Sequence, residues 1–168
     1  MPAIGPNRPA GAVGIKLLIA LMVTLIVAIA VWTGICPCER IPGGYLLGEE
    51  IDEPVSDWSF ANAVPLCQIE VRAAGRPHSI NLNCMAADGA LYLSCASCEG
   101  KYWSTAVLER PAARLRIADR VYPVIVTRVI EPAILDTAWR ARADKVGRGA
   151  DQPRQEGWWS FRVVSRGD

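Results

Sequence analysis

An uncharged apolar run near the N-terminus limits what this chain can fold into more than any other feature. Leu17 to Ile35 reads LLIALMVTLIVAIAVWTGI, which is 19 residues without a formal charge. At about 1.5 Å of rise per residue, a helix of this length just crosses a hydrocarbon core of about 30 Å. A cleaved secretory signal has a shorter apolar region, about 7–15 residues, that ends at a small-x-small site. Because this run continues through Trp32 and Ile35, we predict one retained transmembrane helix over residues 15–35.

The charges on either side of this helix predict its orientation. Arg8 and Lys16 precede the uncharged run, whereas Arg40 is the only basic residue in the twenty positions after it. The acidic residues in that stretch are Glu39, Glu49, Glu50, Asp52 and Glu53. Basic residues near a membrane-spanning helix favour the cytoplasmic side. We therefore expect a cytoplasmic N-terminus and a folded domain on the outer side of the membrane.

Composition divides the rest of the chain into flexible segments and one domain. Residues 1–14 contain three prolines and three glycines, so we expect a flexible tail. Residues 36–57, with three further prolines, show neither helical nor strand periodicity and are interpreted as a tether. Residues 58–168 are left for a single domain. The 18 basic and 17 acidic residues give a net charge of +1, which argues against a nucleic-acid partner.

Alternating apolar and polar residues predict an antiparallel sheet in this domain. Residues 67–71 and 79–84 both alternate, and turn residues separate them. A hairpin centred on Gly75-Arg76 pairs residues whose numbers sum to 151, which places Cys67 directly opposite Cys84. Opposite Cα atoms lie about 4.5–5.5 Å apart, within the reach of a disulfide. We predict this proximity and leave open whether the two thiols are bonded.

A second hairpin follows at Asp88-Gly89, the strongest short turn signal in the chain. It pairs Asn83 with Ser94 and adds a third strand. The apolar residues of the three strands then share one face, and small polar residues share the other. The polar strip, as we call this second set, consists of Ser79, Asn81, Asn83 and Ser94.

The remaining patterns complete a mainly β domain with one or two covering helices. They predict a short helix over 101–108, strands over 113–117 and 121–130, a helix over 131–146, a polar loop over 147–157 and a closing strand over 158–164.

This order of elements resembles a known family. The likeness is carried by the segments RPHSIN at 76–81, DGALYLS at 88–94, GKYW at 100–103 and ERPAARL at 109–115. Together they resemble the split β-barrel flavin-binding family typified by pyridoxamine 5′-phosphate oxidase, whose relatives include deazaflavin-dependent nitroreductases. The likeness covers about residues 58–165 and implies a split β-barrel behind the transmembrane helix.

The resemblance also implies a cofactor, either FMN or a deazaflavin, in a groove at the barrel wall that a second subunit often completes. By position, Ser94, Ser97 and Lys101 would hold its phosphate, and Ser79 and Asn81 would lie near its ring. Lys101 supplies a positive charge beside a predicted helix N-terminus, where anions are favoured. Trp103 and the Trp158-Trp159 pair would cover the ring or a neighbouring subunit, although packing against the barrel is the alternative for at least one of that pair.

The cysteines leave several interpretations open. Cys95 and Cys98 have the CxxC spacing of redox-active pairs, but no βαβ pattern surrounds them. A structural disulfide, free buried thiols or a metal site are the alternatives, and a four-thiolate zinc site would also need Cys36 and Cys38. Their one-residue spacer does not fit that use, so we expect no metal. His78 is the only histidine, and no nucleophile elbow accompanies it, which argues against hydrolysis.

Two functions are consistent with these features. The first is a membrane-anchored flavin- or deazaflavin-dependent oxidoreductase that acts on a small, lipophilic substrate such as a quinone. The second is a cofactor-free accessory subunit that docks on a larger membrane complex. The expected partners are the lipid bilayer and a second copy of the chain or such a complex. The absorbance spectrum of the purified protein distinguishes the two functions.

Overall fold

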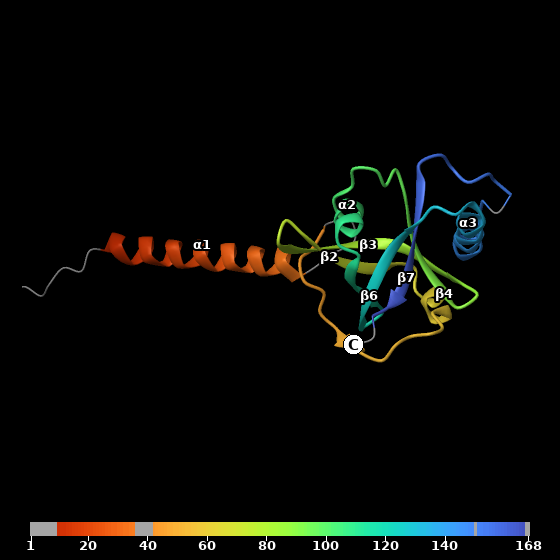
Figure 1. Ribbon diagram of the computed structural model, residues 1–168. Helices are drawn as coiled ribbons and strands as arrows, with labels where there is room; N and C mark the ends of the chain where they lie inside the picture. The colour runs from red at the N-terminus through yellow and green to blue at the C-terminus, as the bar shows by residue number, and fades with distance from the viewer. Residues whose placement is uncertain (1–9, 36–41, 150, 167–168) are drawn as a thin grey trace, which may run out of the picture.

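The computed structural model describes residues 10–35, 42–149 and 151–166. A long helix projects from a domain built mainly of strands (Figure 1). The elements in chain order are α1 (Ala10–Ile35), β1 (Glu49–Glu50), the short 3-10 helix η1 (Ser59–Ala63), β2 (Cys67–Ala73), β3 (Arg76–Ala87), β4 (Ala90–Ala96), α2 (Tyr102–Glu109), β5 (Ala112–Ile117), β6 (Arg120–Val129), α3 (Pro132–Val146) and β7 (Trp158–Ser165).

Helix α1 is a candidate membrane span. It has 26 residues, and every side chain that the structure describes between Gly14 and Val31 is exposed. A window over Gly14–Val31 is long and apolar enough to cross a membrane, although a signal sequence meets the same two criteria. The helix begins at Ala10, within the segment predicted to be a flexible tail. Two alanines among residues 10–13, which follow the last proline of that segment, favour the helix.

Six strands form a closed barrel, which confirms the predicted mainly β fold class. Their order is β6-β5-β2-β3-β4-β7, and the barrel closes where β6 pairs with β7. Every one of these pairings is antiparallel. The predicted second hairpin is confirmed, because Asn83 lies opposite Ser94 across β3 and β4.

The predicted register of the first hairpin is wrong by two residues. Ala73 pairs with Arg76, so the turn residues are Ala74 and Gly75, with φ of 49° and 76°. Positive φ at both positions is the type I′ geometry that suits the twist of a hairpin. Cys67 therefore lies opposite Leu82 instead of Cys84. A shift by two keeps every side chain on its predicted face, because side chains alternate with period 2.

The predicted proximity of Cys67 and Cys84 is nevertheless confirmed. They occupy diagonal positions on β2 and β3, with their Cα atoms 5.7 Å apart, and they form a disulfide. Both residues are fully buried in the barrel interior. The bond closes a loop over 17 positions of sequence and staples the first hairpin at its open end.

The barrel interior holds the main core. Helix α2 and η1 pack onto it and contribute Trp103 and Ala61 among others. Phe161 of β7 is the largest fully buried side chain and lies against the Trp103 ring, with 5.0 Å between centroids. Burying an aromatic or aliphatic side chain stabilises the fold by about 1.5–3 kcal/mol relative to exposure. The alternation of the strands therefore supplies the apolar face that the barrel buries.

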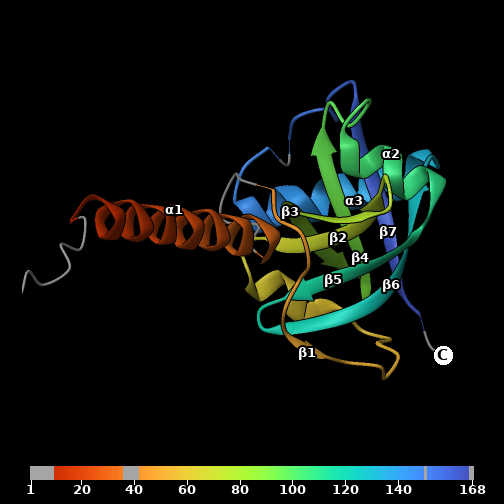
Figure 2. The same ribbon diagram turned by 90° about the vertical axis from the view of Figure 1, so that its left-hand side faces the viewer.

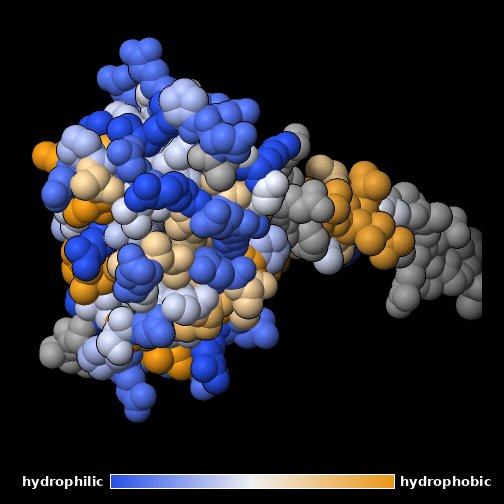
Figure 3. Space-filling model, turned by 90° about the vertical axis from the view of Figure 1, so that its right-hand side faces the viewer, coloured by the Kyte–Doolittle hydropathy of each residue, from blue (hydrophilic) through white to orange (hydrophobic). Residues whose placement is uncertain are grey.

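Helix α3 covers part of the outer face of the barrel. Its Trp139 packs edge-on against Trp158 of β7, with 5.2 Å between ring centroids. Met85 and Tyr92 from β3 and β4 complete this second cluster. Gly147 ends the helix in a left-handed conformation, φ 68°, as glycine commonly does at a helix C-terminus. The surface on this side of the domain, away from α1, is mainly hydrophilic (Figure 3).

The described part of the predicted tether is ordered along the barrel, which corrects the prediction that it lacks regular structure. The backbone of Gly43 exchanges two hydrogen bonds with Ser79 of β3, of 2.8 and 2.9 Å. Strand β1 pairs in parallel with β6, beside which it runs in Figure 2. Leu46 between them is fully buried. Long-range backbone pairing stabilises this segment, and residues 36–41 of the tether lie outside the described residues.

Candidate functional site

An ion pair between buried Glu70 and half-buried Arg114 lies on the outer face of the sheet, in a part of the surface lined by several arginines. Glu70 of β2 and Arg114 of β5 are cross-strand neighbours. One guanidinium nitrogen of Arg114 lies 2.5 Å from a Glu70 carboxylate oxygen, and the other lies 2.5 Å from Glu50 of β1. The same Glu70 oxygen accepts the Leu46 N–H at 2.7 Å. Glu70 thus connects the ordered segment before β1 to the barrel.

Arg114 is held on all sides. Its guanidinium also donates to the Leu46 carbonyl at 3.0 Å and lies 4.1 Å from the centroid of the Tyr45 ring. Burial by itself would lower the pKa of Arg114, but the carboxylates of Glu70 and Glu50 outweigh it and raise that pKa. Arg114 therefore stays charged at every pH the protein meets, and three of its N–H donors are already used.

Three further arginines surround this pair and line a cavity of about 370 Å³. Arg72 belongs to β2, Arg110 precedes β5, and Arg166 follows β7. We call this cavity the arginine groove; its lining residues are Tyr45, Glu50, Glu70, Val71, Arg72, Arg110, Ala112, Ala113, Arg114 and Arg166.

The arginine groove carries an excess of positive charge. Its four arginines face two glutamates, and both glutamates are bound to Arg114. Arg72, Arg110 and Arg166 are exposed, and within the described residues none of them forms an ion pair. Guanidinium groups bind phosphate and carboxylate groups through paired N–H donors. The groove is therefore built to receive an anion.

The residues of the polar strip differ in how far the structure buries them, and Asn83 is half-buried. Ser79 is fully buried, and its hydroxyl has no hydrogen-bond partner among the described residues. Asn81 is half-buried and already interacts with a neighbour. Ser94 is 1% exposed, with its hydroxyl 3.9 Å from the Met85 sulfur in the part of the sheet that α3 covers.

Ser97 and Lys101 do lie together, in the loop that joins β4 to α2. Ser97 is exposed, and the Lys101 ammonium donates to the Ala96 carbonyl at 2.8 Å. Trp103, two residues further on, is 3% exposed and packs into the barrel core. None of the six residues predicted to bind the cofactor lines the arginine groove or the second cavity, which is described below. Their binding roles stay predictions.

Sequence reasoning singled out only part of the arginine groove. Arg110 and Arg114 lie within one of the segments that carry the family resemblance. Arg72 falls on the polar side of its strand, where a solvated charge is ordinary. Nothing in the sequence connects Arg166 to them, because it comes 52 positions after Arg114 and approaches only when the barrel closes.

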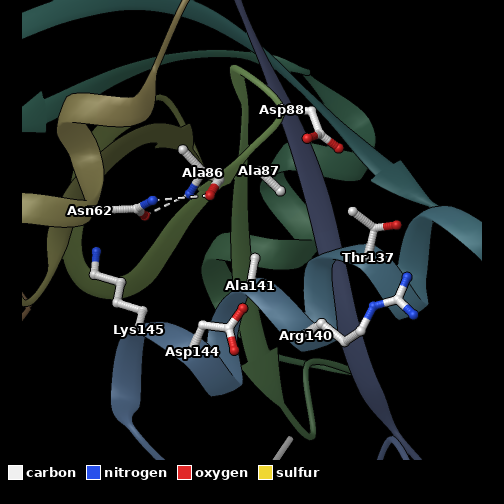
Figure 4. A pocket seen from close by; sticks show the side chains of 9 residues that line it. All are labelled: Asn62, Ala86, Ala87, Asp88, Thr137, Arg140, Ala141, Asp144 and Lys145. Carbon is white, nitrogen blue, oxygen red and sulfur yellow. Dashed lines mark hydrogen bonds between the residues drawn. The ribbon is translucent and has the colours of Figure 1, made fainter.

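A second cavity, of about 590 Å³, lies between η1, the β3–β4 turn and α3 (Figure 4). Asn62 fixes one wall by exchanging two hydrogen bonds with the Ala86 backbone, of 2.8 and 3.0 Å. The Lys145 ammonium donates to the Ala61 and Cys84 carbonyls, and burial lowers its pKa. With Asp88, Arg140 and Asp144, the cavity has two charges of each sign and no clear preference for an anion.

Two smaller findings concern the open interpretations of the cysteines. Cys95 and Cys98 form a disulfide, with Cα atoms 5.6 Å apart. Cys36 and Cys38, which a zinc site would also require, lie outside the described residues. Within the described ranges, no group of three or more His, Cys, Asp or Glu residues lies together as a metal site would require.

Comparisons with known proteins identify the fold. No protein-family model matches the chain, and no curated protein matches its sequence. Among solved structures, a conserved hypothetical protein of Mycobacterium tuberculosis superposes with a TM-score of 0.51 at 16% identity, over 64% of this chain and 76% of that one. A candidate pyridoxamine 5′-phosphate oxidase of Listeria innocua has the same TM-score at 10% identity, over 64% and 88%.

A candidate 5-nitroimidazole antibiotic resistance protein of Bacteroides thetaiotaomicron likewise superposes with a TM-score of 0.51 at 10% identity, over 68% of this chain and 83% of that one. Identities this low show the fold alone. The fold is the split β-barrel found in proteins similar to pyridoxamine 5′-phosphate oxidase, here with an apolar helix in front of it that could cross a membrane.

Proposed function

We propose that this chain is a membrane-anchored split-barrel protein that binds a phosphate-bearing flavin or deazaflavin and acts as an oxidoreductase. The observation that carries the proposal is the arginine groove, which offers three exposed guanidinium groups without partners among the described residues. Both candidate cofactors have an anionic phosphate. Shared fold with a candidate pyridoxamine 5′-phosphate oxidase supports a cofactor of this class.

The residues of the groove fit the anionic end of such a cofactor. Arg72, Arg110 and Arg166 would hold the phosphate, while Arg114 is fixed by Glu70 and shapes the wall. A bound flavin or deazaflavin supplies hydride transfer, and the protein supplies its placement and the surrounding charge. The earlier prediction assigns the phosphate to Ser94, Ser97 and Lys101 instead. Ser94 is buried, so the exposed pair in the loop before α2 is the rival phosphate site.

The membrane location is proposed on two observations. Helix α1 is exposed and apolar along the described part of its length, so it needs a lipid or protein environment. The two disulfides fit a domain in an oxidising compartment on the outer side of the membrane, because disulfides are rare in the cytosol. A domain tethered to the bilayer surface is well placed to meet a lipophilic substrate such as a quinone.

Spectroscopy of the full chain in detergent tests the proposal. Bound FMN absorbs at about 450 nm and a bound deazaflavin at about 420 nm, as general properties of these cofactors. Titration with FMN should give tighter binding than titration with riboflavin, which has the same ring without the phosphate. Equal affinity for the two would show that no phosphate site is used.

Matched variants then locate the phosphate. Arg110→Ala should weaken FMN binding by about 1.5–3 kcal/mol, the range for a hydrogen bond to a charged group. Arg120→Ala is the control, because Arg120 is exposed and pairs loosely with Glu49 outside the groove. If Lys101→Ala weakens binding and Arg110→Ala does not, the phosphate lies at the loop before α2 and the assignment to the groove is wrong.

A second candidate function rests on the burial of the predicted cofactor residues. Ser79, Ser94 and Trp103 are covered by the chain itself. A barrel whose cofactor surface has been filled in this way would serve as an accessory subunit on a larger membrane complex. A protein that remains colourless and unchanged in melting temperature after incubation with FMN and with a deazaflavin supports this second candidate.

A further inference from the structure

The Cys95–Cys98 disulfide is the feature that the proposed function leaves unused. It lies where β4 ends and the loop to α2 begins, and it spans only two intervening residues. Ser97 within it has a positive φ of 51°, and its N–H donates to the Gly157 carbonyl at 3.1 Å. Ala96, Ser97 and the loop residues after Cys98 are exposed, so the disulfide sits just beneath the surface.

The two cysteines differ in exposure. Cys95 is 8% exposed and Cys98 is fully buried. Cys67 and Cys84, which form the other described disulfide, are both fully buried. Attack on a disulfide requires access to one of its two sulfurs. Cys95 is the less buried end of the loop disulfide, so we take its sulfur as the one attacked and the fully buried Cys98 as the leaving thiolate.

The surroundings of Cys98 favour that thiolate. Helix α2 begins four positions after it, and no side chain caps the helix N-terminus. The Cys98 carbonyl accepts hydrogen bonds from the Lys101 N–H at 3.2 Å and from the Ser104 hydroxyl at 2.5 Å, which hold it against this N-terminus. The partial positive charge of a helix N-terminus lowers the pKa of a nearby thiol.

Charged side chains around the loop reinforce this effect. The Lys101 ammonium is anchored at the Ala96 carbonyl, between the two cysteines. From the neighbouring strands, Trp159 lies opposite Cys95 and carries the Arg128 guanidinium 3.5 Å from its ring centroid. Glu99 is the carboxylate of the loop itself, and it is exposed. The loop and the strand beside it thus carry two cations against one solvated carboxylate, a balance that favours the reduced, thiolate form.

Stabilisation of the fold does not explain the Cys95–Cys98 disulfide well. In the chain-entropy model, the stabilisation from a disulfide grows with the length of the loop that it closes. Cys67 and Cys84 are 17 positions apart and join two barrel strands, whereas Cys95 and Cys98 are three apart. The long-range bond is therefore the structural staple of the barrel.

We propose that Cys95 and Cys98 form a dithiol–disulfide exchange centre that accepts two electrons from a protein dithiol. A thiolate of the partner attacks the Cys95 sulfur, the Cys95–Cys98 bond breaks, and Cys98 leaves as a thiolate. The second thiolate of the partner then attacks the sulfur of the partner's first cysteine in the mixed disulfide. This step releases Cys95 as a thiolate. The partner dithiol is oxidised to a disulfide, and Cys95 and Cys98 are reduced. The two protons that the partner thiols lose are taken up from solution by the two product thiolates.

The wild-type chain provides the first test, with the second disulfide as an internal control. The full chain in detergent is equilibrated with mixtures of reduced and oxidised dithiothreitol, trapped with a maleimide and mapped by peptide mass. We expect the Cys95–Cys98 pair to open in the folded protein while Cys67–Cys84 stays closed. If both pairs open only when the barrel unfolds, the loop disulfide is structural and the proposal is wrong.

Single variants test the assigned roles. Cys98→Ser leaves Cys95 free and should form a mixed disulfide with oxidised glutathione about ten-fold faster or more than Cys95→Ser does, because access decides which sulfur reacts. The alkylation rate of Cys98 in Cys95→Ser should rise with pH, with a midpoint below the ordinary cysteine value of about 8.5. Adding Lys101→Met should move this midpoint upward. Equal rates for the two single variants, or an unmoved midpoint, would overturn the assignment.

Discussion

Replacing Glu70 with glutamine tests whether the ion pair with Arg114 organises the sheet edge. Glu70 is 7% exposed and binds both the Arg114 guanidinium and the Leu46 N–H. Glu70→Gln keeps the shape of the side chain and one acceptor oxygen, but it removes the charge. Its amide group also places N–H donors near the donors of Arg114 and Leu46. The change therefore isolates the electrostatic part of the contact.

The expected loss follows from the burial of the two partners. Removing one partner of a fully buried pair costs about 3–5 kcal/mol. Arg114 is 19% exposed and keeps Glu50, so a cost of about 2–3 kcal/mol is expected after this discount for solvent. With an m-value of about 1–3 kcal/mol/M in urea, the unfolding midpoint should fall by about 0.7–3 M.

The assay is urea unfolding of the full chain in detergent, followed by tryptophan fluorescence. Glu49→Gln is the matched control, because Glu49 and Arg120 are 3.6 Å apart and mostly exposed. Such surface pairs contribute about 0–1 kcal/mol, so this variant should unfold close to wild type. A Glu70→Gln midpoint that matches the Glu49→Gln midpoint would refute the idea that the buried pair organises this edge.

Four further outcomes are expected. Burial lowers the pKa of His78, so the unfolded chain binds protons more readily, and stability should fall as the pH drops below about 6.5. His78→Asn should remove that part of the pH dependence in unfolding titrations between about pH 5 and pH 8. Trp103→Ala empties space beside Phe161 and should lower the free energy of unfolding by about 3–5 kcal/mol in the same urea assay. Breaking the Cys67–Cys84 bond by a double alanine substitution should cost about 3 kcal/mol or more, measured by thermal unfolding. A protease added outside intact cells should remove the domain; protection until lysis would reverse the proposed orientation.

The strands were predictable because their alternation is local. Each strand buries one face, so the pattern of apolar residues specifies both the element and the side that packs. Asp88-Gly89 also specifies its own hairpin, since both residues accept positive φ and the structure gives them 49° and 75°. At the first hairpin the turn is Ala74-Gly75, and Ala74 takes a positive φ that alanine rarely adopts. The sequence therefore offers no reason to place Ala74 in the turn, and the choice of Gly75-Arg76 is wrong.

The ordered segment before the barrel was not predictable from local pattern. Its backbone pairs with Ser79 and with β6, residues that lie 36 and 71 positions further along the chain from Gly43 and Glu49. Prolines and glycines in that stretch indicate a loop, which is what the sequence shows locally. Only the closed barrel creates the partners that order it.

The face on which the polar strip lies was predictable, but its burial was not. The segments that cover the outer face of the sheet explain the difference. The polar strip was predicted on the outer face, and the shifted register keeps it there. Outer faces of a barrel bind ligands only where the chain leaves them open, however. Helix α3 covers the sheet beside Ser94, and the segment around Gly43 covers Ser79.

The two candidate phosphate sites lie at opposite ends of α2. The loop with Ser97 and Lys101 precedes this helix, and Arg110 of the arginine groove follows it. A helix of 8 residues is about 12 Å long, so the two basic positions are too far apart to share one phosphate. An anion must choose one end, and the end with three exposed guanidinium groups offers more donors than the end where the ammonium already binds a carbonyl. The positive charge at Lys101 is then free to act on the cysteines beside it, so an anion site and a thiol site can coexist on one short helix without competing for the same cation.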